Sequence, residues 1–395
     1  MEIEDYFEAI GEDVWQPDNY EHPLVLGKAV RRHNTEHGFP SLAGVQIALL
    51  GVNEDRFATN NKGCALAPDR IRKHLYSLFQ GPFRLQIADL GNIRRGNQVS
   101  DTFYAVKQVV AWLIKNKITP VIIGGSQDIT YANYQAYEEL GQIINLVAID
   151  ACFDIGIRKD EKTNHRNYLS TILTHQPNYL FNYVNIGYQS YFVDQDAIEL
   201  MEKLYFDAFR LGVVRKDMEE VEPIVRNADM VSFDISSVRQ PDAPGNANAS
   251  PNGFTGEEAC QIIRYAGLSD KLSSIGFYEV NPSLDRGDQT SHLVAQMIWY
   301  FLDGYFHRKN DMPDRNRKDA GEYIKYVVSI KDFKDAITFY KSKKSDRWWM
   351  EVPYPAGLHQ KYERQFLVSC SYKDYLAACQ DEMPEKWWQV YHKYL

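Results

Sequence analysis

Short apolar runs alternate with longer amphipathic segments between about residues 45 and 305 of the chain. Each apolar run is four to eight residues long and is bounded by glycine, proline or polar residues, as expected for a buried strand. The predicted strands are Val45–Val52, Leu85–Leu90, Thr119–Ile123, Leu146–Ile149, Tyr183–Gly187, Phe209–Gly212, Met230–Phe233 and Leu272–Tyr278.

The segments between these runs have the spacing of helices that pack against a sheet. Ile71, Leu75 and Leu78, for example, recur at intervals of four and three. The predicted helices are residues 67–79, 100–117, 131–140, 168–173, 194–204, 216–226, 255–267 and 291–304, and residues 1–40 hold one further amphipathic candidate. Strands that alternate with helices predict an α/β fold with three layers, a mainly parallel sheet between two layers of helices.

The composition changes at about residues 308–321, which are polar and charged. We therefore divide the chain into an N-terminal extension (1–44), an α/β domain (45–307) and a linker with an aromatic-rich C-terminal appendage (308–395). Strands at 323–330 and 347–352 and helices at 372–380 and 384–394 predict an α+β appendage. Its apolar surface suggests a protein partner.

Charge and composition exclude several classes of function. The 395 residues carry a net charge of −9 and contain no basic stretch, which argues against nucleic-acid binding. The sequence contains no run of 18 or more apolar residues, so we predict no membrane span. The acidic N-terminus lacks a signal sequence, and the five cysteines form no CxxC pair, so we expect reduced thiols in a cytoplasmic protein.

Three of the apolar runs end in polar side chains. Thr119–Ile123 leads into Gly124-Gly125-Ser126-Gln127-Asp128, the run ending at Ile149 leads into Asp150-Ala151-Cys152-Phe153-Asp154, and the run ending at Phe233 leads into Asp234-Ile235-Ser236. The carboxyl ends of parallel strands meet at one edge of a sheet, so these side chains predict one shared site.

These segments, together with the PG and GFTGEE of residues 244–258 and the EVNPSLD of residues 279–285, resemble the ureohydrolase family of arginase, agmatinase and formimidoylglutamase. The resemblance covers about residues 45–305. It implies an arginase-like domain and a pair of Mn²⁺ ions, bridged by a hydroxide that attacks the carbon of an amidine or guanidine substrate.

The resemblance places metal ligands at six positions, of which three are altered. Asp150, Asp154 and Asp234 match the family, whereas Gln127 and Cys152 replace histidines and Ser236 replaces an aspartate. By the family's arrangement, Asp150 and Asp234 bridge the ions. Asp154 and Gln127 complete one ion, and Cys152 and Ser236 would complete the other.

The altered ligand set predicts either no metal or a single weakly bound Mn²⁺ or Mg²⁺, because the second ion would have only the bridging acids, a thiol and a hydroxyl. Two further residues are implied by resemblance. Glu279 matches the carboxylate that binds the substrate amidine, and His165 lies near a proton-shuttling histidine. In an active enzyme, we expect Asp154, Glu279 and His165 to be the catalytic residues.

Two functions compete. The favoured hypothesis is a protein that has lost dinuclear manganese catalysis and acts as a binding, regulatory or scaffolding protein, with the aspartates hydrogen-bonded within the fold. The alternative is a hydrolase of linear amidine C–N bonds that works with one metal or an altered pair. A third idea, a cysteine nucleophile at Cys152, lacks a neighbouring histidine base. The resemblance also implies a small amidine or amino-acid ligand and a homo-oligomer.

Overall fold

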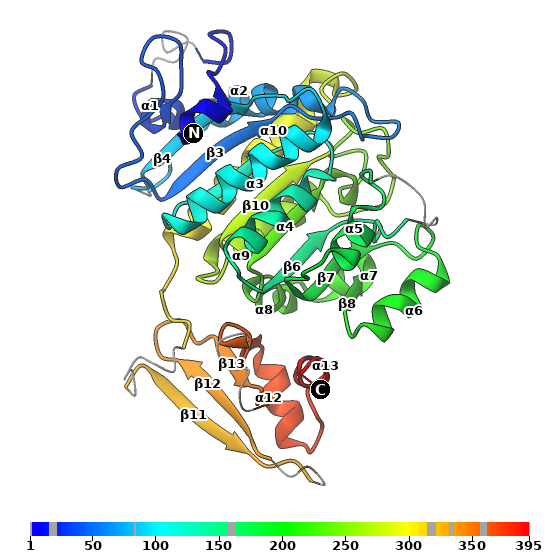
Figure 1. Cartoon of the computed structure of the whole chain (residues 1–395). Coiled ribbons are helices and arrows are strands. Elements are labelled where there is room, and N and C mark those ends of the chain that lie inside the picture. Colours follow the sequence, from blue (N-terminus) through cyan, green and yellow to red (C-terminus); the bar gives the residue numbers. More distant parts are fainter. Residues whose placement is uncertain are drawn as a thin grey trace.

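A large parallel sheet lies at the centre of the molecule, and a smaller antiparallel sheet lies beside it (Figure 1). The computed structural model describes residues 2–15, 22–82, 84–156, 163–313, 321–331, 333, 335–355 and 362–394. The strands of the large sheet are β1 (Phe7–Glu8), β2 (Arg31–Arg32), β3 (Ile47–Val52), β4 (Ile87–Ile93), β5 (Thr119–Ile123), β6 (Ile144–Ile149), β7 (Leu180–Tyr188), β8 (Asp207–Arg210), β9 (Met230–Asp234) and β10 (Ser274–Tyr278).

The strands of this sheet follow the order β1-β4-β3-β5-β10-β9-β6-β7-β8, with β2 beside β4. All pairings in it are parallel except that of β1 with β4. The central strands are buried along their whole length, as continuous apolar runs require. The predicted strand positions in the α/β region are therefore confirmed to within a few residues.

Helices cover both faces of the sheet, which confirms the three-layer architecture. One face packs against α2 (Ala67–Ser77), α8 (Val221–Arg226), α9 (Gly256–Leu268) and α10 (Gln289–Phe306). The other face packs against α3 (Val99–Lys115), α4 (Ile129–Glu139), α5 (Tyr168–Thr174) and α6 (Gln195–Lys203).

Two helix predictions were wrong. The single helix predicted at 216–226 is instead α7 (Leu211–Lys216), a 3₁₀ turn and α8, because Asp217 has a non-helical backbone (φ −149°, ψ 79°) that ends α7. The predicted N-terminal helix is replaced by a 3₁₀ turn at Ile3–Tyr6 and by the four-residue α1 (Leu26–Ala29). Residues 1 and 16–21 of that prediction lie outside the described residues.

The C-terminal appendage has its own sheet, in the order β11-β12-β13-β14, with two helices. Its elements are β11 (Tyr323–Val328), β12 (Ile337–Ser342), β13 (Trp348–Glu351), β14 (Leu367–Cys370), α12 (Tyr372–Cys379) and α13 (Glu385–His392). The α+β character is as predicted, although β12 and β14 were missed. The boundaries at residues 44 and 307 stay a prediction, and part of the expected linker (314–320) lies outside the described residues.

The appendage packs against the amino ends of the strands in the large sheet. Arg226 of α8 donates hydrogen bonds to the carbonyl oxygens of Trp348 and Cys370, and its guanidinium lies 4.5 Å from the ring centre of Trp349. Gln365 donates to the carbonyl of Ile143, just before β6. These contacts lie at the end of the sheet opposite the carboxyl ends of its strands. None of the helices in the described part of the chain has the length and apolarity to cross a bilayer.

Candidate functional site

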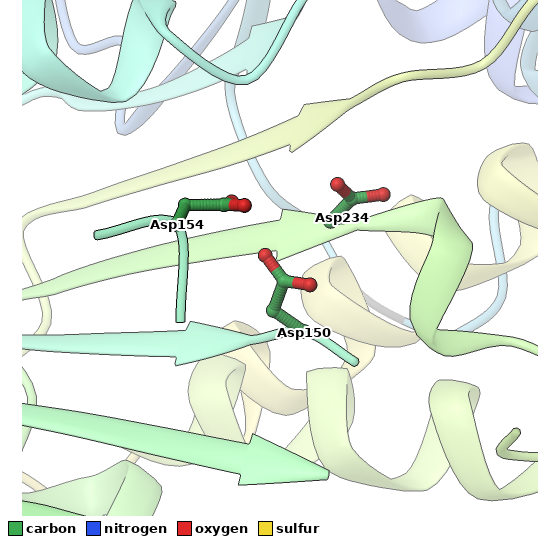
Figure 2. Close-up of side chains that lie close together, drawn as sticks. All are labelled: Asp150, Asp154 and Asp234. Atoms are coloured by element: carbon green, nitrogen blue, oxygen red, sulfur yellow. The ribbon is translucent and has the colours of Figure 1, made fainter. Parts of the chain in front are cut away.

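Asp150, Asp154 and Asp234 converge at the carboxyl ends of two neighbouring strands, β6 and β9. One carboxylate oxygen from each lies within 4.8 Å of the other two, and Figure 2 shows the three side chains pointing toward one another. Asp234 ends β9, Asp150 follows β6 directly, and Asp154 lies in the loop beyond. The loop holds Asp154 in the left-handed region (φ 52°), a conformation that costs a non-glycine residue free energy and is found most often at functional sites.

The three carboxyls repel one another in a buried setting. Burial first, and the neighbouring Asp150 and Asp234 second, raise the pKa of Asp154 well above its usual range. Burial and the charge of Asp150 likewise raise the pKa of Asp234 well above its usual range, and burial also raises the pKa of Asp150. Because buried like charges are costly, the arrangement favours either a proton or a cation between the carboxyls.

Gln127, which the resemblance places at a histidine position, contacts this cluster from the turn that follows β5. Its side chain is fully buried, and its Nε2 donates to Oδ2 of Asp150 (2.9 Å) and to the hydroxyl of Tyr168 (3.3 Å). Its Oε1 is buried and has no hydrogen-bond partner among the described residues. A buried amide oxygen without a donor is unusual, and a flip of the amide would exchange it with the Nε2 that faces Asp150 and so give the cluster a fourth oxygen that a cation could use.

Cys152 and Ser236 lie beside the cluster but offer weak ligands. Burial and the charges of the three aspartates raise the pKa of the Cys152 thiol, so it stays protonated at neutral pH. The Ser236 hydroxyl is neutral, and its backbone N–H donates to Oδ1 of Asp234 (2.6 Å). The residues therefore suit one hard divalent cation among the three aspartates and Gln127, and they do not suit a pair of ions.

Glu279 and His165 form a second pair next to the aspartates. Oε1 of Glu279 accepts hydrogen bonds from Nδ1 of His165 (3.1 Å) and from the backbone of Gln127 (2.9 Å), while Oε2 accepts one from Asn61 (2.7 Å). Glu279 is fully buried and has φ 68°, again a left-handed conformation. Protein donors already form hydrogen bonds with both carboxylate oxygens of Glu279. The contact of Glu279 with a ligand, which the resemblance implies, therefore stays a prediction.

His165 faces the other way, toward a large cavity. Because the Glu279 carboxylate can only accept, Nδ1 of His165 carries a proton in this contact, and Nε2 is left as an acceptor when the ring is neutral. Nε2 is buried and has no hydrogen-bond partner among the described residues. The cavity has a volume of about 1350 Å³ and is lined by the three aspartates and His165, together with the side chains of residues such as Phe192 and Asn248.

Sequence reasoning missed several residues of the site. Asn61 comes from a loop 218 residues before Glu279, and Tyr168 begins α5; neither lies in a strand-end motif. Arg166 could have been found, because it follows His165 directly. Among the described residues that line the cavity, one is a Lys or Arg: Arg166, which donates to Oδ1 of Asn248 (2.9 Å).

The geometry can now be set beside known proteins. Residues 45–303 match the arginase family. The chain belongs to the arginase family. This match ends before the appendage begins and includes every site residue described above.

Its relatives include formimidoylglutamases. The chain is 29% identical over 273 residues to a formimidoylglutamase of Staphylococcus haemolyticus, a match that covers 65% of this chain and 85% of the relative. A formimidoylglutamase of Staphylococcus aureus is 26% identical over 268 residues, with the same coverage.

Solved structures of this family share the fold. Bacillus subtilis formimidoylglutamase superposes with a TM-score of 0.65 at 18% identity, covering 73% of this chain and 95% of that one. Trypanosoma cruzi formiminoglutamase, crystallised with Mn²⁺, has a TM-score of 0.62 at 18% identity, covering 68% and 96%. The resemblance inferred from the sequence is confirmed, and the chain has the fold of a C–N hydrolase family.

Proposed function

We propose that this protein hydrolyses a C–N bond of a linear amidine, with one divalent cation, Mn²⁺ or Mg²⁺, held by Asp150, Asp154 and Asp234. The cluster of three carboxyls at the strand ends, of which those of Asp150 and Asp234 are buried, is the observation that carries this proposal. The formimidoylglutamase relatives support the same chemistry. This is the alternative that the sequence alone had placed second.

The residues around the cluster fit one cation. After a flip of its amide, the orphaned Oε1 of Gln127 would add a neutral oxygen to the three carboxylates. Together they form the all-oxygen set that hard cations prefer. A divalent cation there supplies Lewis-acid chemistry, since it lowers the pKa of a bound water and polarises an amidine.

The chain's own groups perform the remaining tasks. Glu279 holds the His165 ring, so that Nε2 can accept a proton from a reacting water and return it to the leaving amine. Negative charge at the base of the cavity attracts a cationic amidine. Arg166, on the cavity wall, is placed to bind a carboxylate of the same ligand.

Hydrolysis of N-formimidoyl-L-glutamate is the decisive assay. We expect the metal-stripped protein to be inactive. Addition of Mn²⁺ or Mg²⁺ should restore the release of L-glutamate, with one ion bound per chain. Agmatine and arginine serve as amidines with a different tail. If metal binds and neither formimidoyl nor guanidino substrates are hydrolysed, the hydrolase proposal is wrong.

A second candidate, a non-catalytic binding protein, is favoured by one specific observation. Three of the family's six ligand positions carry Gln127, Cys152 and Ser236, and the Cys152 thiol stays protonated. Such a protein would bind the same amidine without turnover. Its role with protein partners, through the appendage or as a homo-oligomer, would then be tested by pull-down and by light scattering of the full chain.

Arg166→Gln should separate substrates by their charge. We expect KM for N-formimidoyl-L-glutamate to rise roughly tenfold or more, because a charge-assisted hydrogen bond to a carboxylate is lost. KM for agmatine, which has no carboxylate, should change less than twofold. Steady-state kinetics with both substrates check this. Equal increases for the two would mean that Arg166 acts on the cavity as a whole rather than on the carboxylate.

The triple variant Gln127→His, Cys152→His and Ser236→Asp should restore a second metal site. With a family-like backbone, the added imidazoles and carboxylate complete the ligands of both ions, so bound Mn²⁺ should rise from about one to about two per chain. Metal analysis after dialysis measures the ratio. A triple variant that folds and still binds one ion would show that these positions do not share one site.

A further inference from the structure

Three arginines, two from the β8–α7 segment and one from the loop after β9, line a second cavity. It has a volume of about 320 Å³ and lies beside the large cavity, with Pro251 in the wall of both. Arg210 ends β8, Arg215 lies on α7, and Arg239 follows β9. The remaining lining is mainly polar: Tyr188, Gln189, Ser190, Tyr191, Leu211, Gly212, Pro251, Asn252 and Gly253.

The positive charge at this cavity is only partly neutralised. Arg215 pairs with Glu258 (Nε–Oε1, 3.0 Å), and Arg239 pairs with Asp242 (Nε–Oδ2, 3.1 Å). Arg210 has no carboxylate within ion-pair distance among the described residues. Three guanidinium groups thus face two carboxylates, and one net positive charge is left.

Many donors at this cavity are also left without protein partners. Both ion pairs use Nε, and the described residues offer no hydrogen-bond acceptor to the terminal nitrogens of Arg215 or Arg239, nor to any nitrogen of Arg210. A guanidinium has five N–H donors in a planar fork that matches an oxyanion. The three side chains that carry these donors all line one small cavity.

We propose that this cavity, defined by Arg210, Arg215 and Arg239, is a binding site for a small oxyanion. Its polar lining and its size suit a phosphate or carboxylate group rather than an apolar ligand. The inference is separate from amidine hydrolysis, since none of the three arginines belongs to the aspartate cluster. The oxyanion is either a phosphate group or a carboxylate, and competition distinguishes the two.

Binding of radiolabelled inorganic phosphate to the metal-stripped full chain tests the site. At constant ionic strength, equilibrium dialysis should give saturable binding of one phosphate per chain. Arg210→Gln and Arg239→Gln should each weaken it roughly tenfold or more, because each removes a charge-assisted contact. Unlabelled succinate that displaces the phosphate identifies a carboxylate site, whereas failure to displace it identifies a phosphate site.

Arg264→Gln is the matched control. Arg264 lies on α9, is exposed to a degree similar to Arg215 (37% against 46% of the side chain), and pairs with Asp303 at 2.7 Å, away from the cavity. We expect its phosphate affinity to stay within twofold of the parent. Phosphate binding that does not saturate, or that falls equally in all three variants, would overturn the proposal. Melting temperatures verify that each variant is folded.

Discussion

Asp234→Asn should abolish tight binding of divalent cations and also raise the melting temperature of the metal-free protein. The first effect follows from the loss of one of three charged ligands, for which we expect a fall in Mn²⁺ affinity of roughly 100-fold or more. The second follows because the amide keeps the shape of the side chain while one of the mutually repelling buried charges disappears. A substitution at a functional site that stabilises the fold is a typical exchange between stability and activity.

The direction in which folding stability changes with pH distinguishes this charge repulsion from an effect of packing. The pKa values of Asp154 and Asp234 are raised above those of the unfolded chain, so the folded state holds more protons above about pH 4. Stability from this cluster is present at low pH and is lost as the pH rises through the folded pKa values. The difference in stability between the variant and the parent should therefore grow as the pH is raised.

Thermal unfolding of both proteins at several pH values, with EDTA or with Mn²⁺, measures these effects. Asp285→Asn is a useful control, because Asp285 is about equally buried and also accepts backbone hydrogen bonds, from Thr290 and Ser291, but lies outside the aspartate cluster. We expect that control to lower the melting temperature and to leave Mn²⁺ binding intact. A destabilised Asp234→Asn protein would mean that the carboxylate is a structural hydrogen-bond acceptor and not part of a cation site.

Site residues that directly follow a strand could be predicted from the sequence, whereas those that come from elsewhere in the chain could not. Asp150 and Asp234 were predictable because each comes directly after an apolar run, and the ends of neighbouring parallel strands must meet. The contact between Asn61 and Glu279 could not be predicted, because it joins a loop and a strand end that no local sequence pattern connects. The lack of a hydrogen-bond partner for Oε1 of Gln127 could not be predicted either, because it depends on the orientation of the side-chain amide.

Burial alone does not explain which strands the local patterns predicted. The central strand β9 is buried along its whole length, and its run Met230–Phe233 is apolar except for Ser232. The fully buried β14 was nevertheless missed, whereas β11, which has no buried residue, was predicted. In the appendage, β12 mixes apolar residues with Thr338, Lys341 and Ser342, so its apolar pattern is weaker. The three-arginine cavity has no sequence signature, since the fold brings the β8–α7 segment, with Arg210 and Arg215, next to the loop that carries Arg239.

The attachment of the appendage depends on a buried acid, Asp229, at the amino end of β9. Its carboxylate lies 3.5 Å from Nζ of Lys271 and 2.7 Å from the guanidinium of Arg364, and it accepts the backbone N–H of Asn145 (2.9 Å). Lys271 also donates to Gln365 (3.0 Å), which belongs to the appendage. One carboxylate thus holds charges from both parts of the molecule.

Asp229→Asn should destabilise the protein by about 3–5 kcal/mol, because it leaves the almost fully buried Lys271 without its counter-charge. Urea unfolding monitored by tryptophan fluorescence measures the loss. The exposed pair of Asp217 and Lys373 supplies the control: Asp217→Asn should leave the free energy of unfolding nearly unchanged, since a solvated ion pair contributes little. Equal losses would mean that the pair at Asp229 is also solvated.

The pKa of Lys271 provides a second, independent test of its ion pair with Asp229. Burial lowers it to about 8, and the nearby Asp229 opposes that fall. Between about pH 8 and the unfolded value near 10.4, the unfolded chain holds more protons than the folded one, so stability contributed by Lys271 rises with pH in this window. Without Asp229 the opposing attraction is gone, and the window should begin at a lower pH. The double variant Asp229→Asn with Lys271→Met should then recover part of the lost stability, because it removes the buried charge itself; no recovery would place the energy in the contacts of Arg364 and Asn145 instead.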